Sequence, residues 1–174
     1  MSVTLRLLTL ADAPAVETLA GAYEVALNTL MIPHPYPEGA AELWIADVGP
    51  HTFAIDVDGE LVGVTGLRMK EEELAEIGYW IGLPFWGRGF ASEAARQVIR
   101  YGFEERGLHR IFAAHFTRNP ASGKVMVNAG MKFEGTLRRH VKKWGEYLDV
   151  NFYGILREEW LSARGTEGRT AERG

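Results

Sequence analysis

The sequence of 174 residues contains no cysteine. This absence excludes disulfide bonds, thiolate metal ligands and a cysteine nucleophile. The sequence also lacks any run of about 18 apolar residues, the length that a membrane span requires, and its first residues show no basic segment followed by an apolar stretch. We therefore expect a cytoplasmic protein with no membrane partner, no metal site, and chemistry that uses other side chains.

An excess of positive charge is missing as well. The formal net charge at pH 7 is -4, so the chain lacks the basic surplus that is typical of nucleic-acid-binding domains. Two familiar phosphate motifs are also absent: no GxxxxGK[ST] segment occurs, and Gly87 to Ser92 lacks the third glycine of the dinucleotide fingerprint. These absences argue against a nucleic-acid partner, a P-loop domain and a Rossmann domain.

The composition that remains is that of an ordinary globular domain. Hydrophobic residues make up 47% and charged residues 24% of the chain, and the length fits one domain. After residue 161 the apolar period disappears. We predict one domain over residues 1–161 and a disordered tail over residues 162–174.

Local signals in the first third predict strands and helices in alternation. Asp12 with Pro14 marks a helix start, and three prolines within residues 33–37 remove backbone donors, which predicts a loop. Asp58-Gly59 supplies the positive φ of a tight hairpin turn. The predicted elements are a strand at 3–7, a helix from 12 to about 26, a helix at 38–47, and paired strands at 52–57 and 60–67.

The rest of the chain continues this mixed pattern. Residues 73–82 alternate as a strand does and extend the antiparallel order. Their two faces carry Ile77, Tyr79 and Ile81 on one side, and Glu76, Gly78 and Trp80 on the other. A glycine-rich turn then feeds a helix to residue 105, followed by a strand at 110–116, a helix at 119–129, and a closing hairpin with strands at 133–144 and 147–156.

The glycine-rich turn at residues 86–92 is the main chemical signal. Gly87 and Gly89 allow close approach of the backbone to a ligand, and the following helix start presents N–H groups that have no carbonyl partner. Such an arrangement suits an anion, and several N–H groups together suit a diphosphate. A simple tight connection would also explain the glycines, so the turn is one line of support among several.

At this point the sequence resembles the GNAT family, the GCN5-related N-acetyltransferases, and within it the ribosomal-protein N-terminal acetyltransferases. The family signature [QR]-x-x-G-x-[GA] is matched by Gly89 and Ala91, whereas Trp86 stands where glutamine or arginine is usual. The resemblance extends from Leu5 to Trp160. Further matches are Glu76 to Ile81, Asn119 with Ser122, the stretch Gly130-Met131 with Phe133 and Gly135, and Asp149 with Tyr153.

The resemblance implies an α/β (α+β) fold: a mixed, mostly antiparallel sheet of about seven strands, splayed between the fourth and fifth, with about four helices. It also implies acetyl-coenzyme A as cofactor, held in the splay with its diphosphate on the turn. Parted strands leave backbone groups free for a pantetheine arm, and one such N–H could stabilise an oxyanion. The candidate cofactor-binding residues are Ile81, Gly82, Gly87, Arg88, Gly89, Ala91, Ser92, Asn119 and Lys124.

The candidate catalytic residues are Glu76 and Ser122. Only a neutral amine attacks a thioester, and Glu76 is a candidate base, directly or through water. His140 is an alternative base, because the pKa range of histidine suits proton transfer, and a surface residue on a strand is its structural alternative. The carboxylate that the resembled branch often carries near Val141 is absent, which leaves the choice of base open. The resemblance suggests that Ser122 donates to the departing thiolate. A helix cap for Ser122 and an exposed strand carboxylate for Glu76 are the structural alternatives.

The acceptor is the least defined part. The expected function is acetyl transfer to a primary amine, either a protein N-terminus, such as that of a ribosomal protein, or a small amine; a homodimer is compatible with the resemblance. A binding-only acyl-coenzyme A sensor and an ordinary nucleotide-binding domain are the competing hypotheses. The loop at Pro33 to Pro37 is a candidate wall of the acceptor cleft. Its aromatic lining, or alternatively core or dimer contacts, would come from Trp44, Trp80, Trp86, Trp144, Tyr36 and Tyr147.

Overall fold

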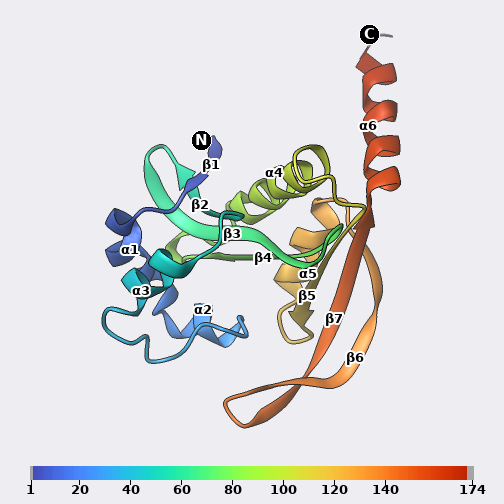
Figure 1. Cartoon of the computed structure of the whole chain (residues 1–174). Coiled ribbons are helices and arrows are strands. Elements are labelled where there is room, and N and C mark those ends of the chain that lie inside the picture. Colours follow the sequence, from blue (N-terminus) through green and yellow to red (C-terminus); the bar gives the residue numbers. More distant parts are fainter. Residues whose placement is uncertain (1, 172–174) are drawn as a thin grey trace.

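The computed structural model describes residues 2–171, with side chains as far as residue 165. Its centre is one seven-stranded sheet in the order β1-β2-β3-β4-β5-β7-β6 (Figure 1). This mixed sheet confirms the expected fold class. The strands are β1 (Val3–Leu7), β2 (Thr52–Val57), β3 (Glu60–Glu71), β4 (Leu74–Ile81), β5 (Arg110–Phe116), β6 (Lys132–Lys143) and β7 (Glu146–Leu156).

The helices flank this sheet and connect its strands. Two short 3₁₀ helices, η1 (Leu10–Asp12) and η2 (Leu83–Phe85), precede α1 and α4. The described residues form six α-helices rather than the expected four or so. They are α1 (Ala13–Ala20), α2 (Tyr23–Leu27), α3 (Ala40–Asp47), α4 (Phe90–Glu104), α5 (Pro120–Asn128) and α6 (Arg157–Ala171).

The predicted single helix over residues 12–26 is wrong, because the chain breaks it at Gly21. A Cβ added at Gly21 would lie 2.6 Å from the carbonyl oxygen of Glu17 and 3.4 Å from Cβ of Tyr36. The later loop therefore packs directly on the end of α1, and the chain turns before it forms α2. This long-range contact has no signal in the local sequence pattern.

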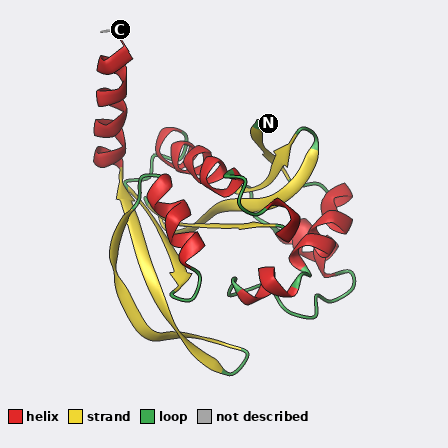
Figure 2. Cartoon of the chain, turned by 180° about the vertical axis from the view of Figure 1, so that it is seen from behind, coloured by secondary structure: helices red, strands yellow, loops and turns green. Residues whose placement is uncertain are grey.

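Different helices cover the two faces of the sheet, as the packing of neighbouring residues of β2 shows. Ile55 is buried with Phe90 and Ala94 of α4, whereas its neighbour Ala54 is buried with residues of α1 and α3. Figure 2 shows α4 and α5 together on one side of the strands. Within residues 2–171, none of the helices is long and apolar enough to cross a membrane.

The C-terminal helix α6 follows β7 and extends away from the body of the molecule (Figure 1). Its first turns are anchored: Trp160 packs on Phe103 with ring centroids 5.4 Å apart, and Arg164 pairs with Glu104. The tail predicted to be disordered, residues 162–174, overlaps this helix as far as Ala171, and residues 172–174 lie outside the described part. A helix of this length that projects away from the body is only marginally stable in water, so disorder of the tail stays a prediction.

Candidate active site

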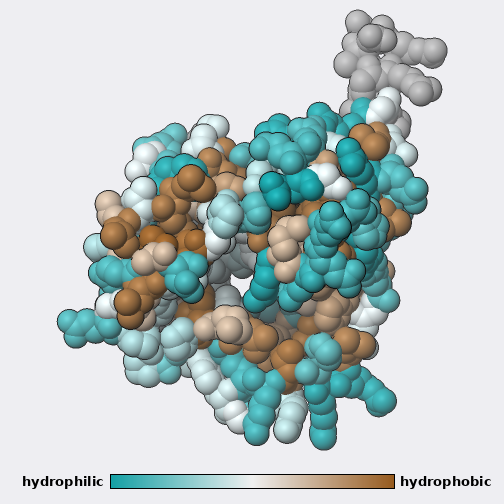
Figure 3. All heavy atoms as spheres, viewed as in Figure 1, coloured by the Kyte–Doolittle hydropathy of each residue, from teal (hydrophilic) through white to brown (hydrophobic). Residues whose placement is uncertain are grey.

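A split between β4 and β5 is the central feature of the site. The two strands run parallel and pair at only three positions, Leu74 with Arg110, Ala75 with Ile111 and Glu76 with Phe112. Beyond Glu76, β4 stays with β3, while β5 stays with β7 as far as Phe116. The expected splay between the fourth and fifth strands is therefore confirmed. In the orientation of Figure 1, the molecular surface is hollowed near its centre (Figure 3).

The edge of β4 that faces the split offers fewer free groups than expected. The N–H of Gly82 donates to the carbonyl of Val62 at 2.9 Å, and the carbonyl of Gly82 accepts from Phe85 N–H at 2.9 Å. The prediction of unpaired backbone groups at Gly82 is therefore wrong. Since the bonding direction alternates along an antiparallel strand, the backbone groups of Ile81 point away from β3 and toward the split.

One of the two backbone groups of Ile81 is already used. Its carbonyl accepts a hydrogen bond of 2.7 Å from the indole N–H of Trp86. Trp86, which stands where the family signature usually has glutamine or arginine, thus ties the turn to the end of β4. The N–H of Ile81 remains as the donor aimed into the split.

The turn before α4 has the conformation that an anion site needs. Gly87 and Gly89 adopt φ values of 76° and 81°, which L residues rarely adopt. A Cβ at either position would meet nothing within 4 Å, so the glycines are needed for conformation rather than for space. The first main-chain bond across the turn joins Glu93 N–H to Gly89 O at 3.2 Å; earlier N–H groups of the helix have no carbonyl one turn before them. The exposed turn therefore fits a diphosphate.

The other predicted cofactor residues differ in what their side chains can reach. Ser92 is buried and its hydroxyl accepts from Asn128 at 3.4 Å, so only its main chain faces the turn. Arg88 is exposed, donates to the carbonyl of Pro84 at 3.3 Å and lies over the Phe85 ring. Ala91 is half-buried at the start of α4, and Lys124 is exposed on α5. Phosphate contacts of Arg88 and Lys124 stay predictions.

Residues of α5 stand on the other side of the split. The side chain of Asn119 accepts from the N–H of Ser122 at 3.4 Å and caps the helix. The cap that was the structural alternative for Ser122 is thus supplied by Asn119, and Ser122 lies inside the first turn. The Ser122 hydroxyl lies 2.9 Å from the hydroxyl of Tyr79, and the Tyr79 hydroxyl donates to the Ser122 carbonyl at 3.0 Å. A direct link therefore spans the split from β4 to α5, which the sequence did not indicate.

Glu76 lies where the strands part, on the face of β4 opposite Tyr79. Its carboxylate contacts Lys70 Nζ at 2.8 Å and Arg68 Nη2 at 3.4 Å, and 21% of its side chain is exposed. The two cations come from β3, the neighbouring strand. They hold the carboxylate in place while leaving part of it open to solvent, and its role as a base stays a prediction.

The loop of residues 28–39, here named the proline loop, is held by the hairpin of β6 and β7. Lys143 is buried, and its ammonium group donates to the carbonyls of Leu30 at 3.3 Å and Ile32 at 3.0 Å. Burial and the nearby charge of Arg118 lower the pKa of Lys143. Arg118 itself donates to the carbonyl of Leu27 at 2.9 Å. Two cations therefore hold this part of the chain by its backbone.

An aromatic group joins the same segments. The ring of Trp144 stacks on that of Tyr23 with centroids 5.8 Å apart, and His34 packs against Tyr23 at 5.2 Å. Tyr23 and Trp144 are each 50% exposed. Sequence reasoning missed Lys143, Tyr23 and His34, because Lys143 and Trp144 lie more than a hundred positions from the residues that they contact here.

The remaining aromatic candidates fall into two groups. Trp44 and Trp80 pack against the core cluster beneath α1 and α3, so they fit the structural alternative. Tyr147 is 58% exposed and stacks with the ammonium of Lys142. The alternative base, His140, lies exposed on β6, and its ring packs in a T-shaped arrangement with that of Phe152, with centroids 5.7 Å apart. The aromatic residues therefore do not form one cleft lining.

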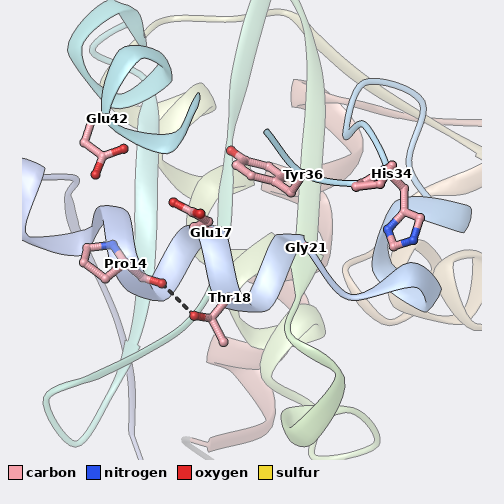
Figure 4. A pocket seen from close by; sticks show the side chains of 8 residues that line it. Pro14, Glu17, Thr18, Gly21, His34, Tyr36 and Glu42 are labelled. Carbon is pink, nitrogen blue, oxygen red and sulfur yellow. Dashed lines mark hydrogen bonds between the residues drawn. The ribbon is translucent and has the colours of Figure 1, made fainter. Parts of the chain in front are cut away.

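An open hollow of about 610 Å³ lies beside the proline loop, between α1 and α3. Figure 4 shows Glu17 and Tyr36 pointing into it, with Glu42 above them on α3. Burial and the charges of Glu17 and Glu42 raise the pKa of the Tyr36 hydroxyl. The predicted wall of the acceptor cleft thus borders a hollow with an acidic lining.

Known proteins share both the sequence pattern and this architecture. The model of the acetyltransferase (GNAT) domain matches residues 2–132. An uncharacterized N-acetyltransferase, p20 of Bacillus licheniformis, is 39% identical over 103 residues, which cover 58% of each chain. The chain thus spans little more than half the length of this curated relative. The L-amino acid N-acetyltransferase AaaT of Escherichia coli is 27% identical over 145 residues, covering 81% of this chain and 90% of AaaT.

Solved structures agree over nearly the whole chain. A GNAT-family acetyltransferase from Bacillus anthracis superposes with a TM-score of 0.84 at 27% identity, covering 91% of this chain and 96% of that one. A chimera of the spermidine N-acetyltransferase from Vibrio cholerae reaches a TM-score of 0.77 at 25% identity, covering 92% and 99%. With its split sheet, its glycine turn and a family model that matches most of its length, the chain belongs to the GNAT acetyltransferase family.

Proposed function

We propose that this protein transfers an acetyl group from acetyl-coenzyme A to a primary amine by direct attack of the amine on the thioester. One observation carries the proposal: the pairing of β4 and β5 ends at Glu76 and Phe112, and the exposed positive-φ turn at Gly87 and Gly89 begins α4 beside that split. A strand edge and a helix start are thus combined in one place, which suits an extended cofactor with a diphosphate.

In this proposal each residue has a defined task. The main chain from Gly87 to Ser92 holds the diphosphate, and the N–H of Ile81 donates to the pantetheine arm or the thioester oxygen. Glu76 takes a proton from the amine, directly or through water, and Ser122 donates a hydrogen bond to the departing sulfur. Glu76 lies on the face of β4 opposite Tyr79, the hydrogen-bond partner of Ser122, so Glu76 and Ser122 would approach the thioester from two sides of the sheet.

The acceptor class follows from proton chemistry and from the acidic hollow. At pH 7, deprotonation costs about 1.4 kcal/mol for an α-amino group and about 4.6 kcal/mol for a lysine. A modest base is therefore sufficient for an α-amine, whether that of an amino acid, as the name of AaaT states for that enzyme, or that of a protein N-terminus such as a ribosomal protein's. The carboxylates of Glu17 and Glu42 beside the proline loop favour a cationic acceptor.

We also propose that the protein acts in the cytoplasm and that it forms a homodimer, a state that is compatible with the resemblance. Exposed apolar side chains on the hairpin, among them Leu137 and Tyr147, support a self-contact there. Light scattering of the purified protein tests the stoichiometry, and a monomer at micromolar concentration would remove the dimer from the proposal.

The experiment that tests the function is thiol release from acetyl-coenzyme A, measured with a panel of amines: amino acids, N-terminal peptides, polyamines and lysine-containing peptides. We expect amine-dependent release and an acetylated product by mass spectrometry. Binding without release from any amine would favour the sensor hypothesis. Thermal shifts distinguish the nucleotide-binding hypothesis: coenzyme A at 100 times its Kd should stabilise the fold by about 2.7 kcal/mol, and ATP or NAD should not.

A further inference from the structure

Tyr79 and Ser122 form a hydroxyl pair across the mouth of the split. Tyr79 belongs to β4 and Ser122 to the first turn of α5, which follows β5. The two hydroxyl oxygens are 2.9 Å apart, and the Tyr79 oxygen is also 3.0 Å from the carbonyl oxygen of Ser122. The inference drawn from this pair rests on the proposed function, in which Ser122 faces the departing sulfur.

The hydrogens of the pair can be counted. The phenol has one hydrogen, the serine has one, and the carbonyl only accepts. In one arrangement Tyr79 donates to the Ser122 carbonyl, and the Ser122 hydroxyl donates to the Tyr79 oxygen. In the other, Tyr79 donates to the Ser122 hydroxyl oxygen, and the hydrogen of Ser122 is free to point elsewhere. Both acceptor distances are already hydrogen-bond distances, so the exchange needs only rotation of the two O–H bonds.

The surroundings fix both partners. Tyr79 packs against the core cluster that contains Ile77, and this burial raises the pKa of its hydroxyl, which therefore keeps its hydrogen. At the next residue of α5, a Cβ on Gly123 would lie 2.8 Å from His115 Nε2 and 3.1 Å from the Tyr153 hydroxyl. The first turn of α5 thus sits tightly on β5 and β7, and Ser122 cannot retreat from Tyr79.

We propose that Tyr79 is a positioning residue for Ser122: by donating to the serine oxygen it turns the serine hydrogen toward the departing sulfur and strengthens that donor. A hydroxyl that accepts one hydrogen bond becomes a better donor of the next. Tyr79 itself gives up no proton and need not touch the cofactor. The phenol also ties β4 to α5. If Tyr79 acted through this structural link alone, its loss would lower coenzyme A affinity and melting temperature rather than kcat.

The test compares Tyr79→Phe, Ser122→Ala and the double variant with wild type in the thiol-release assay. We expect Tyr79→Phe to lower kcat by about three- to tenfold, the range for one hydrogen bond, with the KM for acetyl-coenzyme A within about twofold. Ser122→Ala should lower kcat by at least as much. In the Ser122→Ala background, removal of the phenol hydroxyl should cost nothing further.

Tyr101→Phe is the matched control. Its hydroxyl has a single hydrogen bond, to His51 Nδ1 at 2.8 Å, near the far end of α4, and its loss should leave kcat unchanged. Equal losses for Tyr79→Phe with and without Ser122, or a loss that appears in coenzyme A affinity and melting temperature but not in kcat, would overturn the positioning role. If wild type turns over no amine of the panel, the proposed function fails and the positioning role fails with it.

Discussion

Two parts of the site differ in how far apart in the sequence their contacting residues lie. We name the part formed by β4, the glycine turn and α4 the cofactor side, and the part around the proline loop the proline-loop side. On the cofactor side, β4, the turn and α4 are consecutive, and Trp86 reaches back only five residues to the carbonyl of Ile81. On the other side, Lys143 holds the carbonyls of Leu30 and Ile32, more than a hundred residues away. The first side can form from local backbone chemistry, whereas the second exists only in the folded molecule.

This difference suggests a division of labour. In the proposed function, local contacts fix the part that binds the cofactor, and long-range contacts with a buried lysine fix the proposed wall of the acceptor cleft. Because the proposed acceptor wall is held by the hairpin, the sequences of loop and hairpin can change together while the cofactor side keeps its geometry. Changes on the first side should therefore abolish all turnover, and changes on the second should alter acceptor kinetics alone.

The largest effect is expected for Gly89→Val, on the cofactor side. A β-branched residue at φ 81° is strained, and its side chain would enter the open space before the turn. We expect the affinity for coenzyme A to fall by more than about 100-fold, because several N–H hydrogen bonds to the diphosphate would be lost together. Isothermal titration with coenzyme A measures it, and circular dichroism reports whether the sheet stays folded.

Gly107→Val controls for strain. Gly107 follows α4, has φ 66° and has nothing within 4 Å of an added Cβ, so the substitution causes comparable backbone strain away from the turn. It should leave coenzyme A affinity within about twofold. An equal loss of affinity in both variants would mean that strain, rather than the position of the diphosphate, explains the first result.

A smaller effect is expected for Glu76→Gln, at the point where the two sides meet. Because deprotonation of an α-amine at pH 7 costs about 1.4 kcal/mol, loss of a general base should lower kcat by about tenfold at neutral pH, and by less at high pH, where more of the amine is already neutral. A pH profile of kcat/KM for one α-amine checks this. The same loss at neutral and high pH would argue that Glu76 serves only as the partner of Lys70 and Arg68.

On the proline-loop side, Lys143→Met removes the two hydrogen bonds to the loop carbonyls but keeps the length of the side chain. We expect the KM for the acceptor to rise by about three- to tenfold, while the Kd of coenzyme A stays unchanged. Lys142→Met is the matched control, since Lys142 is exposed on the same strand. A parallel rise in the coenzyme A Kd would show that the two sides are coupled rather than separate.

The smallest effect concerns how α1, which borders the acidic hollow, is fastened to β1. Arg6 contacts Asp12 at 2.7 Å, and this hydrogen-bonded pairing lowers the pKa of the Asp12 carboxyl. Because the folded pKa lies below the unfolded value of about 3.9, the stabilisation is complete above that pH and is lost as the pH falls through the folded pKa.

Asp12→Asn should therefore lower the free energy of unfolding by about 1 kcal/mol at pH 7. The difference from wild type should shrink below about pH 4. Urea unfolding at several pH values measures it, with Asp47→Asn, an exposed residue at the end of α3, as the control. A difference that is constant with pH would mean that the charge of Asp12 contributes nothing.

Elements with strong local signals were predicted well. The first strand at Val3–Leu7 and the strand at Arg110–Phe116 have the predicted bounds, and Asp58-Gly59 forms its turn with φ values of 54° and 88°. The break at Gly21 and the paired backbone of Gly82 were not predictable, because each depends on a segment that packs from elsewhere: Tyr36 in one case and Val62 in the other.

The sequence alone determined the order of strands and helices, the glycine turn at Gly87 and Gly89, and through these the family and the cofactor side, because each follows from backbone preferences of neighbouring residues. Only the tertiary structure decided that Tyr79 meets Ser122 across the split and that Lys143 holds the proline loop. A strand pattern tells which face a side chain occupies, but the partner on that face is chosen by packing of distant segments.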